Sequence, residues 1–201
     1  MTILYVETNF LVGIATGRDR ESTDVLARVG PCLTLLIPSV CLFESLAWME
    51  SEFKRRESFH RSMAEQITQL DRDRTSSHAF SLSGLLRQSL VLNNHLKISV
   101  DSRLHQAIAD LTRVSGLIDL NPSILEQSRN SPIINELTDN LILHCILDRA
   151  RTIPSEAKLF LSGNTKDFGS EAVRKALREV GVQYFAETGN LRDWLSAVHP
   201  S

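Results

Sequence analysis

The stretch that most constrains the fold lies at the start of the chain, in residues 3–12. Its first four residues are apolar and rich in branched and aromatic side chains, which predicts a buried strand. Glu7, Thr8 and Asn9 follow at once, and apolar residues then resume at helical spacing. The order of strand, polar triplet and helix is typical of an α/β protein, in which ligands bind at the carboxyl ends of the strands. Since Thr and Asn are ordinary capping residues, the triplet is equally compatible with a simple helix cap.

Further apolar runs predict the remaining strands of a parallel sheet, with helices between them. We expect these strands at residues 32–37, 116–120, 159–162 and 182–185. We expect helices at residues 18–29, from Ser39 onward, and at 134–150, 170–181 and 191–198, the last of them capped by Asn190. Between Ser51 and Ser115 strand patterns are absent, and helical patterns at 53–70, 80–92 and 104–114 are separated by polar breaks at 71–77 and 93–95. The sequence therefore predicts one α/β domain over residues 1–201 with a helical insertion at residues 51–115.

Composition limits the classes of protein that this chain can belong to. With 42% hydrophobic and 23% charged residues it is typical of a globular protein. No apolar run is long enough to span a bilayer and the start of the chain lacks a secretory signal, so we expect a cytoplasmic protein with no membrane partner. Cys32, Cys41 and Cys145 lie in apolar surroundings outside any Cys/His cluster, which favours buried thiols over a zinc site. A net charge of −2 argues against binding nucleic acid by bulk charge alone, but it allows a nuclease with an acidic, metal-neutralised centre.

Several carboxylates occupy positions where helices and strands normally carry apolar residues. Glu44 and Asp139 lie on apolar helix faces, and Asp167 follows a predicted buried strand. Each of them alone is compatible with a cap or with an ion pair to an arginine. Together with Glu7 they come from four separate segments at one edge of the predicted sheet. Four acids meeting there would repel one another unless a hard cation lay between them, and oxygen ligands of this type suit Mg²⁺ or Mn²⁺.

Four segments resemble the acidic motifs of the PIN-domain family of metal-dependent ribonucleases, in the order found in that family. They are VETNFL at residues 6–11, IPSVCLFE at 37–44, TDNLIL at 138–143 and LSGNTKDF at 161–168. The resemblance implies a three-layer α/β sandwich with a central parallel sheet of four to five strands. It also implies an endoribonuclease that uses Mg²⁺ or Mn²⁺ to hydrolyse RNA phosphodiester bonds and leaves a 5′-phosphate.

The resemblance assigns roles to residues at the predicted sheet edge. It gives the catalytic and metal-binding roles to Glu7, Glu44, Asp139 and Asp167, and supporting roles to Thr8, Asn9, Ser162 and Asn164. The family usually has Asp where this chain has Glu7, and many members have an acid where it has Asn164. These departures leave open a second hypothesis, a catalytically inactive PIN-like fold that binds RNA or protein.

Basic residues near these motifs are candidates for binding substrate phosphates. They are Arg18 and Arg20, Lys166, and the cluster Lys54, Arg55, Arg56, His60 and Arg61, for which a solvated helix face is the alternative. Trp48 could stack a base or pack in the core, and His144 could act as a base or be a hydrogen-bonded structural residue. The role of Glu136, one turn before Asp139, stays open. We expect an RNA substrate, and we leave open a toxin role with an antitoxin protein as partner, and a homodimer.

Overall fold

The computed structural model describes residues 2–30, 33–153 and 157–199 of the chain. The chain divides into two compact units, one made of Met1–Ser45 and Leu104–Ser201 and the other of Leu46–Arg103. The second unit overlaps the helical insertion that the sequence predicts. The extent of a single domain over residues 1–201 stays a prediction.

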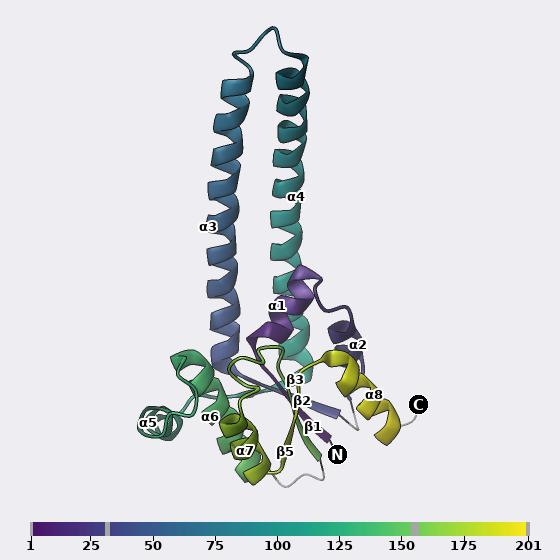
Figure 1. Ribbon diagram of the computed structural model, residues 1–201. Helices are drawn as coiled ribbons and strands as arrows, with labels where there is room; N and C mark the ends of the chain where they lie inside the picture. The colour runs from purple at the N-terminus through teal and green to yellow at the C-terminus, as the bar shows by residue number, and fades with distance from the viewer. Residues whose placement is uncertain (1, 31–32, 154–156, 200–201) are drawn as a thin grey trace. The chain divides into compact units, whose positions relative to one another are not determined.

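A five-stranded, all-parallel sheet forms the centre of the first unit (Figure 1). Its strands are β1 (Thr2–Val6), β2 (Leu33–Pro38), β3 (Ser115–Ile118), β4 (Ala157–Leu161) and β5 (Val182–Phe185), in the spatial order β3-β2-β1-β4-β5. Tyr5 of the central strand pairs with Leu36 on one side and Phe160 on the other. Because all strands point the same way, their carboxyl ends share one edge, here called the carboxyl edge. The α/β fold with a parallel sheet is confirmed.

Helices flank this sheet and follow the predicted pattern with small shifts at their ends. They are α1 (Thr8–Thr16), α2 (Glu21–Ala27), α5 (Pro122–Asn130), α6 (Leu137–Thr152), α7 (Glu171–Glu179) and α8 (Thr188–Val198). The prediction that Asn190 caps the last helix is wrong. Helix α8 begins at Thr188 with Glu187 in the capping position, and the Asn190 amide donates to the Glu187 carboxylate instead.

Aromatic packing holds the loop that follows β4 against the sheet. Phe160 and Phe168 are both fully buried, and their rings meet edge to face with centroids 5.2 Å apart. Aromatic pairs in this arrangement add to the stabilisation from burial alone. The polar residues between them are therefore held near the end of β4, at the carboxyl edge.

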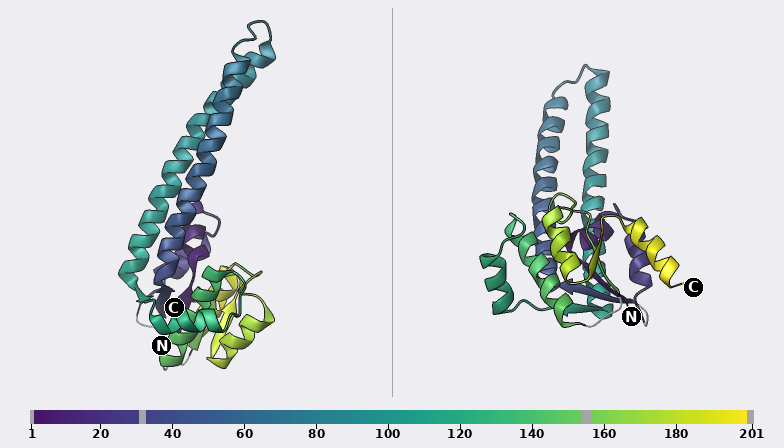
Figure 2. Two further views of the ribbon diagram at one scale, coloured as in Figure 1. Left: turned by 90° about the vertical axis from the view of Figure 1, so that its left-hand side faces the viewer. Right: turned by 60° about the horizontal axis from the view of Figure 1, so that its bottom comes forward.

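The second unit is part of a helical hairpin built from α3 (Ser39–Leu70) and α4 (Ser77–Val114), which run side by side in opposite directions (Figure 2). The predicted break at residues 71–77 is confirmed as the turn, where Asp71 accepts hydrogen bonds from Ser83 and Arg87 of α4. The predicted break at residues 93–95 is wrong, because α4 is continuous there. The Asn93 side chain accepts a hydrogen bond from the Arg56 guanidinium of α3 and donates one to the Arg56 carbonyl, and the helix continues through it.

No described helix has both the length and the apolar character needed to cross a bilayer. The thiols of Cys41 and Cys145 are free and buried, as predicted. Cys32 lies outside the described residues, so its environment stays a prediction.

Candidate active site at the carboxyl edge

Glu7 lies where β1 ends and α1 begins, in the capping position of the helix. Its Oε2 atom accepts a hydrogen bond of 2.7 Å from the backbone N–H of Asn9. The side chain is only 2% exposed, and its other oxygen, Oε1, has no hydrogen-bond partner. Burial raises the pKa of Glu7 to about 7. Hydrogen bonding to the Asn9 backbone and to the Ser162 side chain opposes the rise, and the negative charges of Asp139 and Glu44 add to it. Glu7 thus caps the helix through Oε2 and buries its second oxygen, Oε1, which makes no hydrogen bond of ordinary geometry.

Glu44 comes from the second turn of α3 and contacts the residue that follows Glu7. The hydroxyl of Thr8 donates a hydrogen bond to Glu44 Oε2. Glu44 is half-buried, while its neighbour Phe43 is 73% exposed. The expectation that Glu44 lies on an apolar, core-facing helix side is therefore wrong. The buried side of this turn carries Cys41 and Ser45, and Glu44 lies at its margin.

Asp139 lies in the first turn of α6 and is 9% exposed. Its Oδ2 accepts a 2.9 Å hydrogen bond from the side-chain amide of Asn164. Burial raises the pKa of Asp139 to about 6, and the charges of Glu44, Asp167 and Glu136 contribute further. These effects show that acids from α3, α6 and the loop after β4 lie close enough to influence one another.

The loop after β4 is organised by Asn164. The Asn164 backbone N–H donates to the hydroxyl of the buried Ser162 at 3.1 Å, and its side-chain oxygen accepts from the Asp167 backbone at 3.3 Å. Since its amide also donates to Asp139, Asn164 links the two acids. The backbone carbonyl of Ser162 is fixed in turn by the Tyr184 hydroxyl at 2.8 Å.

The four predicted acids thus share the carboxyl edge, and none of the ion pairs within the described ranges involves them. Among the described residues, however, no three His, Cys, Asp or Glu side chains are grouped closely enough to hold a metal ion. Oxygen donors and the unpartnered Glu7 Oε1 fit a hard divalent cation in their chemistry. The acids therefore suit such a cation, although a complete cluster is not assembled.

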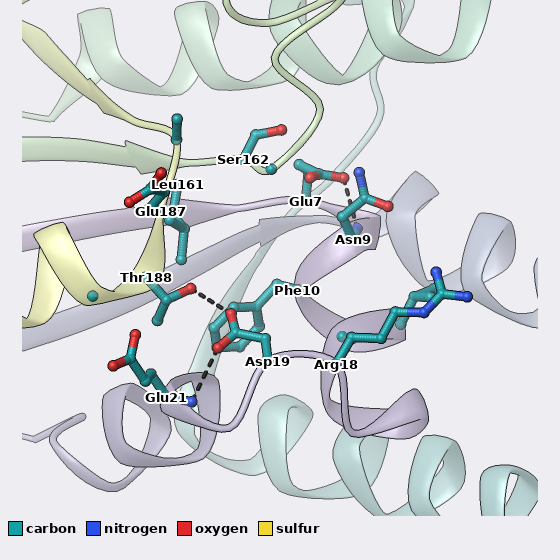
Figure 3. A pocket seen from close by; sticks show the side chains of 15 residues that line it. Glu7, Asn9, Phe10, Arg18, Asp19, Glu21, Leu161, Ser162, Glu187 and Thr188 are labelled. Atoms are coloured by element: carbon teal, nitrogen blue, oxygen red, sulfur yellow. Dashed lines mark hydrogen bonds between the residues drawn. The ribbon is translucent and has the colours of Figure 1, made fainter.

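A cavity of about 490 Å³ adjoins this edge, and Glu7 and Ser162 contribute to its lining (Figure 3). Arg18 and Asp19, which follow α1, also line it. Arg18 is exposed, so it can meet a ligand that enters from solvent. Of the four predicted acids only Glu7 lines this cavity, so the sequence-predicted Arg18 shares it with Glu7 alone.

Asp19 is a structural residue of this cavity that the sequence did not single out. It accepts hydrogen bonds from the hydroxyl of Thr188 and from the backbone of Glu21 (Figure 3), and a third from the hydroxyl of Ser22. Burial opposes its ionisation, but these hydrogen bonds outweigh burial and lower its pKa. The spacing from Asp19 to Ser22 is a helix-capping pattern that could have revealed the local bonds, whereas no sequence pattern points to Thr188.

Asn140 is the second such residue, next to Asp139 in α6. Its side-chain oxygen accepts from the backbones of Ile133 and Ile134 at 2.9 and 3.1 Å, and its amide donates to the Ser128 carbonyl at 2.8 Å. These bonds hold the connection that leads into the first turn of α6. A polar residue on a buried helix face was the only sequence signal for it.

Other predicted residues lie as follows. Lys166 is exposed in the loop that carries Asp167. The His144 ring bonds the Ser131 carbonyl at 3.1 Å, which confirms its structural role. In the second unit the exposed Lys54 and Arg55 pair with Glu50 and Glu52, as the interpretation of a solvated helix face predicts. Arg56 does not fit that interpretation, because it is half-buried and bonds Asn93 of α4 as well as Glu52.

A sequence model described as the PIN domain matches residues 4–168. The chain belongs to the PIN-domain family. The match covers all four acidic motifs, so the family assignment and the carboxyl-edge site agree. PIN domains are generally nucleases and typically depend on divalent metal ions, which gives this chain a nuclease-type function in general terms. No curated protein and no solved structure showed a significant match to the chain.

Proposed function

We propose that this PIN domain is an endoribonuclease that uses Mg²⁺ or Mn²⁺ to hydrolyse RNA phosphodiester bonds. The observation that carries the proposal is Glu7, whose buried Oε1 has no partner and whose pKa is raised to about 7 by burial and neighbouring acids. A carboxylate that is buried without an arginine or a full set of donors is costly to the fold. Strongly raised pKa values of this kind cluster at functional sites.

In this proposal Glu7 and Asp139 would hold the cation, with Glu44 and Asp167 completing its surroundings directly or through water. The chemistry that such a cation supplies is Lewis-acid stabilisation of negative charge on the phosphodiester oxygens. The chain's own part is to orient the acids with neutral donors. The Thr8 hydroxyl fixes Glu44, and the Asn164 amide fixes Asp139, without adding a positive charge that would compete with the cation.

The substrate in this proposal is RNA, with phosphates bound by exposed basic residues near the site. Arg18 on the cavity wall and Lys166 beside Asp167 are the candidates in the first unit. Lys54, Arg55 and Arg56 would bind phosphate only by exchanging their glutamate partners. We extend the proposal to the toxin of a toxin–antitoxin pair, which a neighbouring gene for a small DNA-binding protein would support.

The direct test is Asp139→Asn, which keeps the size of the side chain and removes its charge. We expect cleavage of a labelled single-stranded RNA in Mn²⁺ to fall by about 100-fold or more, because several kcal/mol of charge stabilisation depend on the site. The matched control is Asp119→Asn, an exposed acid that follows β3 at the same edge, which should cleave normally. Chelator-sensitive cleavage that survives in Asp139→Asn would contradict the assignment.

A second candidate function is an inactive PIN domain that binds RNA or protein. Two observations favour it: within the described part of the chain no three-residue metal cluster is assembled, and Asn164 stands where many family members have an acid. Calorimetric titration with Mn²⁺ separates the two functions. Failure to bind at millimolar concentrations, together with absent cleavage, would favour the binding module.

A further inference from the structure

The second unit, residues 46–103, exposes an unusual amount of apolar surface. It is hereafter called the hairpin unit. Of the sixteen large apolar side chains exposed among the described residues, nine belong to these residues. Contiguous apolar patches on a folded protein mark surfaces that bind something. Seven of these nine residues lie on α4.

Four leucines form a stripe along the outer surface of α4, here called the leucine stripe. They are Leu82, Leu85, Leu92 and Leu96, with exposures of 47%, 61%, 58% and 44%. Their spacing of three, seven and four residues is a heptad pattern, in which Ser89 occupies the one remaining position. The seam that packs against α3 is a different set, which includes the buried Ala79, Ser83 and Val100. The stripe is therefore a second, unpaired heptad seam on a helix that already has one partner.

The charges around the leucine stripe indicate what can cover it. Between Ser77 and Val100 the helix has no acidic residue, and its only lysine or arginine residues are Arg87 and Lys97. Arg87 pairs with Asp71 in the turn, and Lys97 lies over the ring of Phe53 at 5.0 Å. Both cations are thus engaged elsewhere on the hairpin. A matching surface should be apolar and without charge, which the leucine stripe itself is.

We propose that the leucine stripe is the contact surface for a second copy of this chain, paired antiparallel about a two-fold axis near Ser89. The leucines lie seven and four residues before Ser89 and three and seven residues after it, so the stripe reads nearly the same in both directions. A two-fold axis requires a patch that is complementary to itself. In this pairing Leu82 of one copy lies against Leu96 of the other, and the small Ser89 lets the helices approach at the centre.

Phe59 of α3 extends the same face. The Arg56–Asn93 hydrogen bond fixes the register of the hairpin, so Phe59, three residues further along α3, lies at the level of α4 residues beside Ser89. Helical spacing places Phe59, which is 55% exposed, on the side of the seam that carries the stripe. Burying five such side chains in each of two copies would remove on the order of 1,000 Å² from water, which is the lower limit for a specific interface.

The first test is the double variant Leu85→Glu/Leu92→Glu in the full chain, examined by sedimentation velocity over a range of concentrations. We expect the wild-type chain to dimerise and the variant's Kd to rise by at least about 100-fold, because two central leucines are replaced by charges. The matched control is Gln88→Glu/His95→Glu, which adds the same charges at the same spacing on an exposed face of α4 outside the stripe. Circular dichroism verifies that all three proteins are equally helical.

The second test fixes the orientation and stays informative even if the charged variant folds poorly. Chains with Leu82→Cys are mixed with chains with Leu96→Cys and treated with a short bismaleimide, with the wild type as control for the native thiols. The mixture should cross-link, whereas either variant alone should not. Cross-linking of Leu82→Cys with itself would overturn the antiparallel pairing. A wild-type chain that stays monomeric at high micromolar concentration would overturn the dimer and assign the stripe to another partner.

Discussion

The carboxyl edge of the sheet and the hairpin unit depart from ordinary globular packing in opposite directions. At the edge, Glu7 and Asp139 are charged groups with exposures of 2% and 9%. On the hairpin, Phe80 and Leu85 are apolar groups with exposures of 83% and 61%. Buried polar groups and exposed apolar patches are the two deviations that carry information about function, because each costs free energy that the isolated chain does not recover.

The difference suggests what each region lacks. Buried carboxylates are stabilised by positive charge, so the cation proposed above would complete the edge. Exposed leucines are stabilised by removal from water, so the second copy proposed above would complete the hairpin unit. The carboxyl edge and the hairpin unit therefore call for partners of unrelated chemistry, and the two proposals can be tested independently. We expect the stability of the edge to depend on its polar groups and the stability of the hairpin to depend on them much less.

The largest expected effect is on the pH dependence of stability, through Glu7. Its pKa is about 7 in the folded chain against the ordinary value of 4.5, so the folded state holds this proton more firmly than the unfolded state does. In the absence of metal, the free energy of unfolding should fall by about 3 kcal/mol as the pH rises from about 5 to about 8. Glu7→Gln should remove this contribution and leave a smaller decrease of the same sign from Asp139. Urea unfolding of the wild type and of Glu7→Gln at several pH values, with a metal chelator present, measures both decreases.

The control for this experiment is Glu187→Gln, because Glu187 also occupies a helix-capping position but is exposed. It should follow the wild-type pH profile. Adding Mn²⁺ should restore stability to the wild type at high pH through preferential binding to the folded state. A wild-type chain that is equally stable at both pH values would show that the edge tolerates the charge of Glu7 without a cation.

Much of this fold was predictable because strands and helices alternate with distinct periodicities. Residues 3–6 and 182–185 were predicted as strands almost to the residue, since both are short stretches rich in branched and aromatic side chains. The predicted break at residues 93–95 was wrong for a physical reason. The helix propensity of Asn is only modestly unfavourable, and tertiary contacts such as the hydrogen bond from Arg56 to Asn93 override it.

The candidate site was predictable in its acids and less so in their partners. Glu7 and Asp139 stood out because a carboxylate on an apolar face is unusual at any position. The hydrogen bonds from Thr8 to Glu44 and from Asn164 to Asp139 join segments far apart in the chain, so no local pattern encodes them. Asp19 and Asn140 were missed because their local signals, a capping pattern and a polar residue on a helix, do not tell whether the side chain is buried and fully bonded or exposed.

The next prediction replaces an amide at the edge by an apolar residue of similar size. Asn164→Leu removes the donor to Asp139 and the acceptor for the Asp167 backbone, and leaves a buried carboxylate without its partner. We expect a loss of about 2 kcal/mol in the free energy of unfolding and a further rise in the pKa of Asp139. Urea unfolding gives the first value, and the carboxyl chemical shift measured against pH gives the second. A variant as stable as the wild type would mean that Asp139 finds another donor.

The smallest effect is expected from the same substitution in the hairpin, Asn93→Leu. Asn93 is half-buried in the α3–α4 seam, where its neighbours in the heptad pattern include Leu86 and Leu90. Leucine fits such a seam, and Arg56 keeps its ion pair with Glu52, so stability should change by less than about 1 kcal/mol. A polar residue in a heptad seam typically fixes register at some cost in stability. Hydrogen exchange along α4 should therefore show a looser register in Asn93→Leu at nearly unchanged unfolding free energy. A loss as large as that of Asn164→Leu would instead show that the hairpin, like the edge, depends on its buried polar contacts.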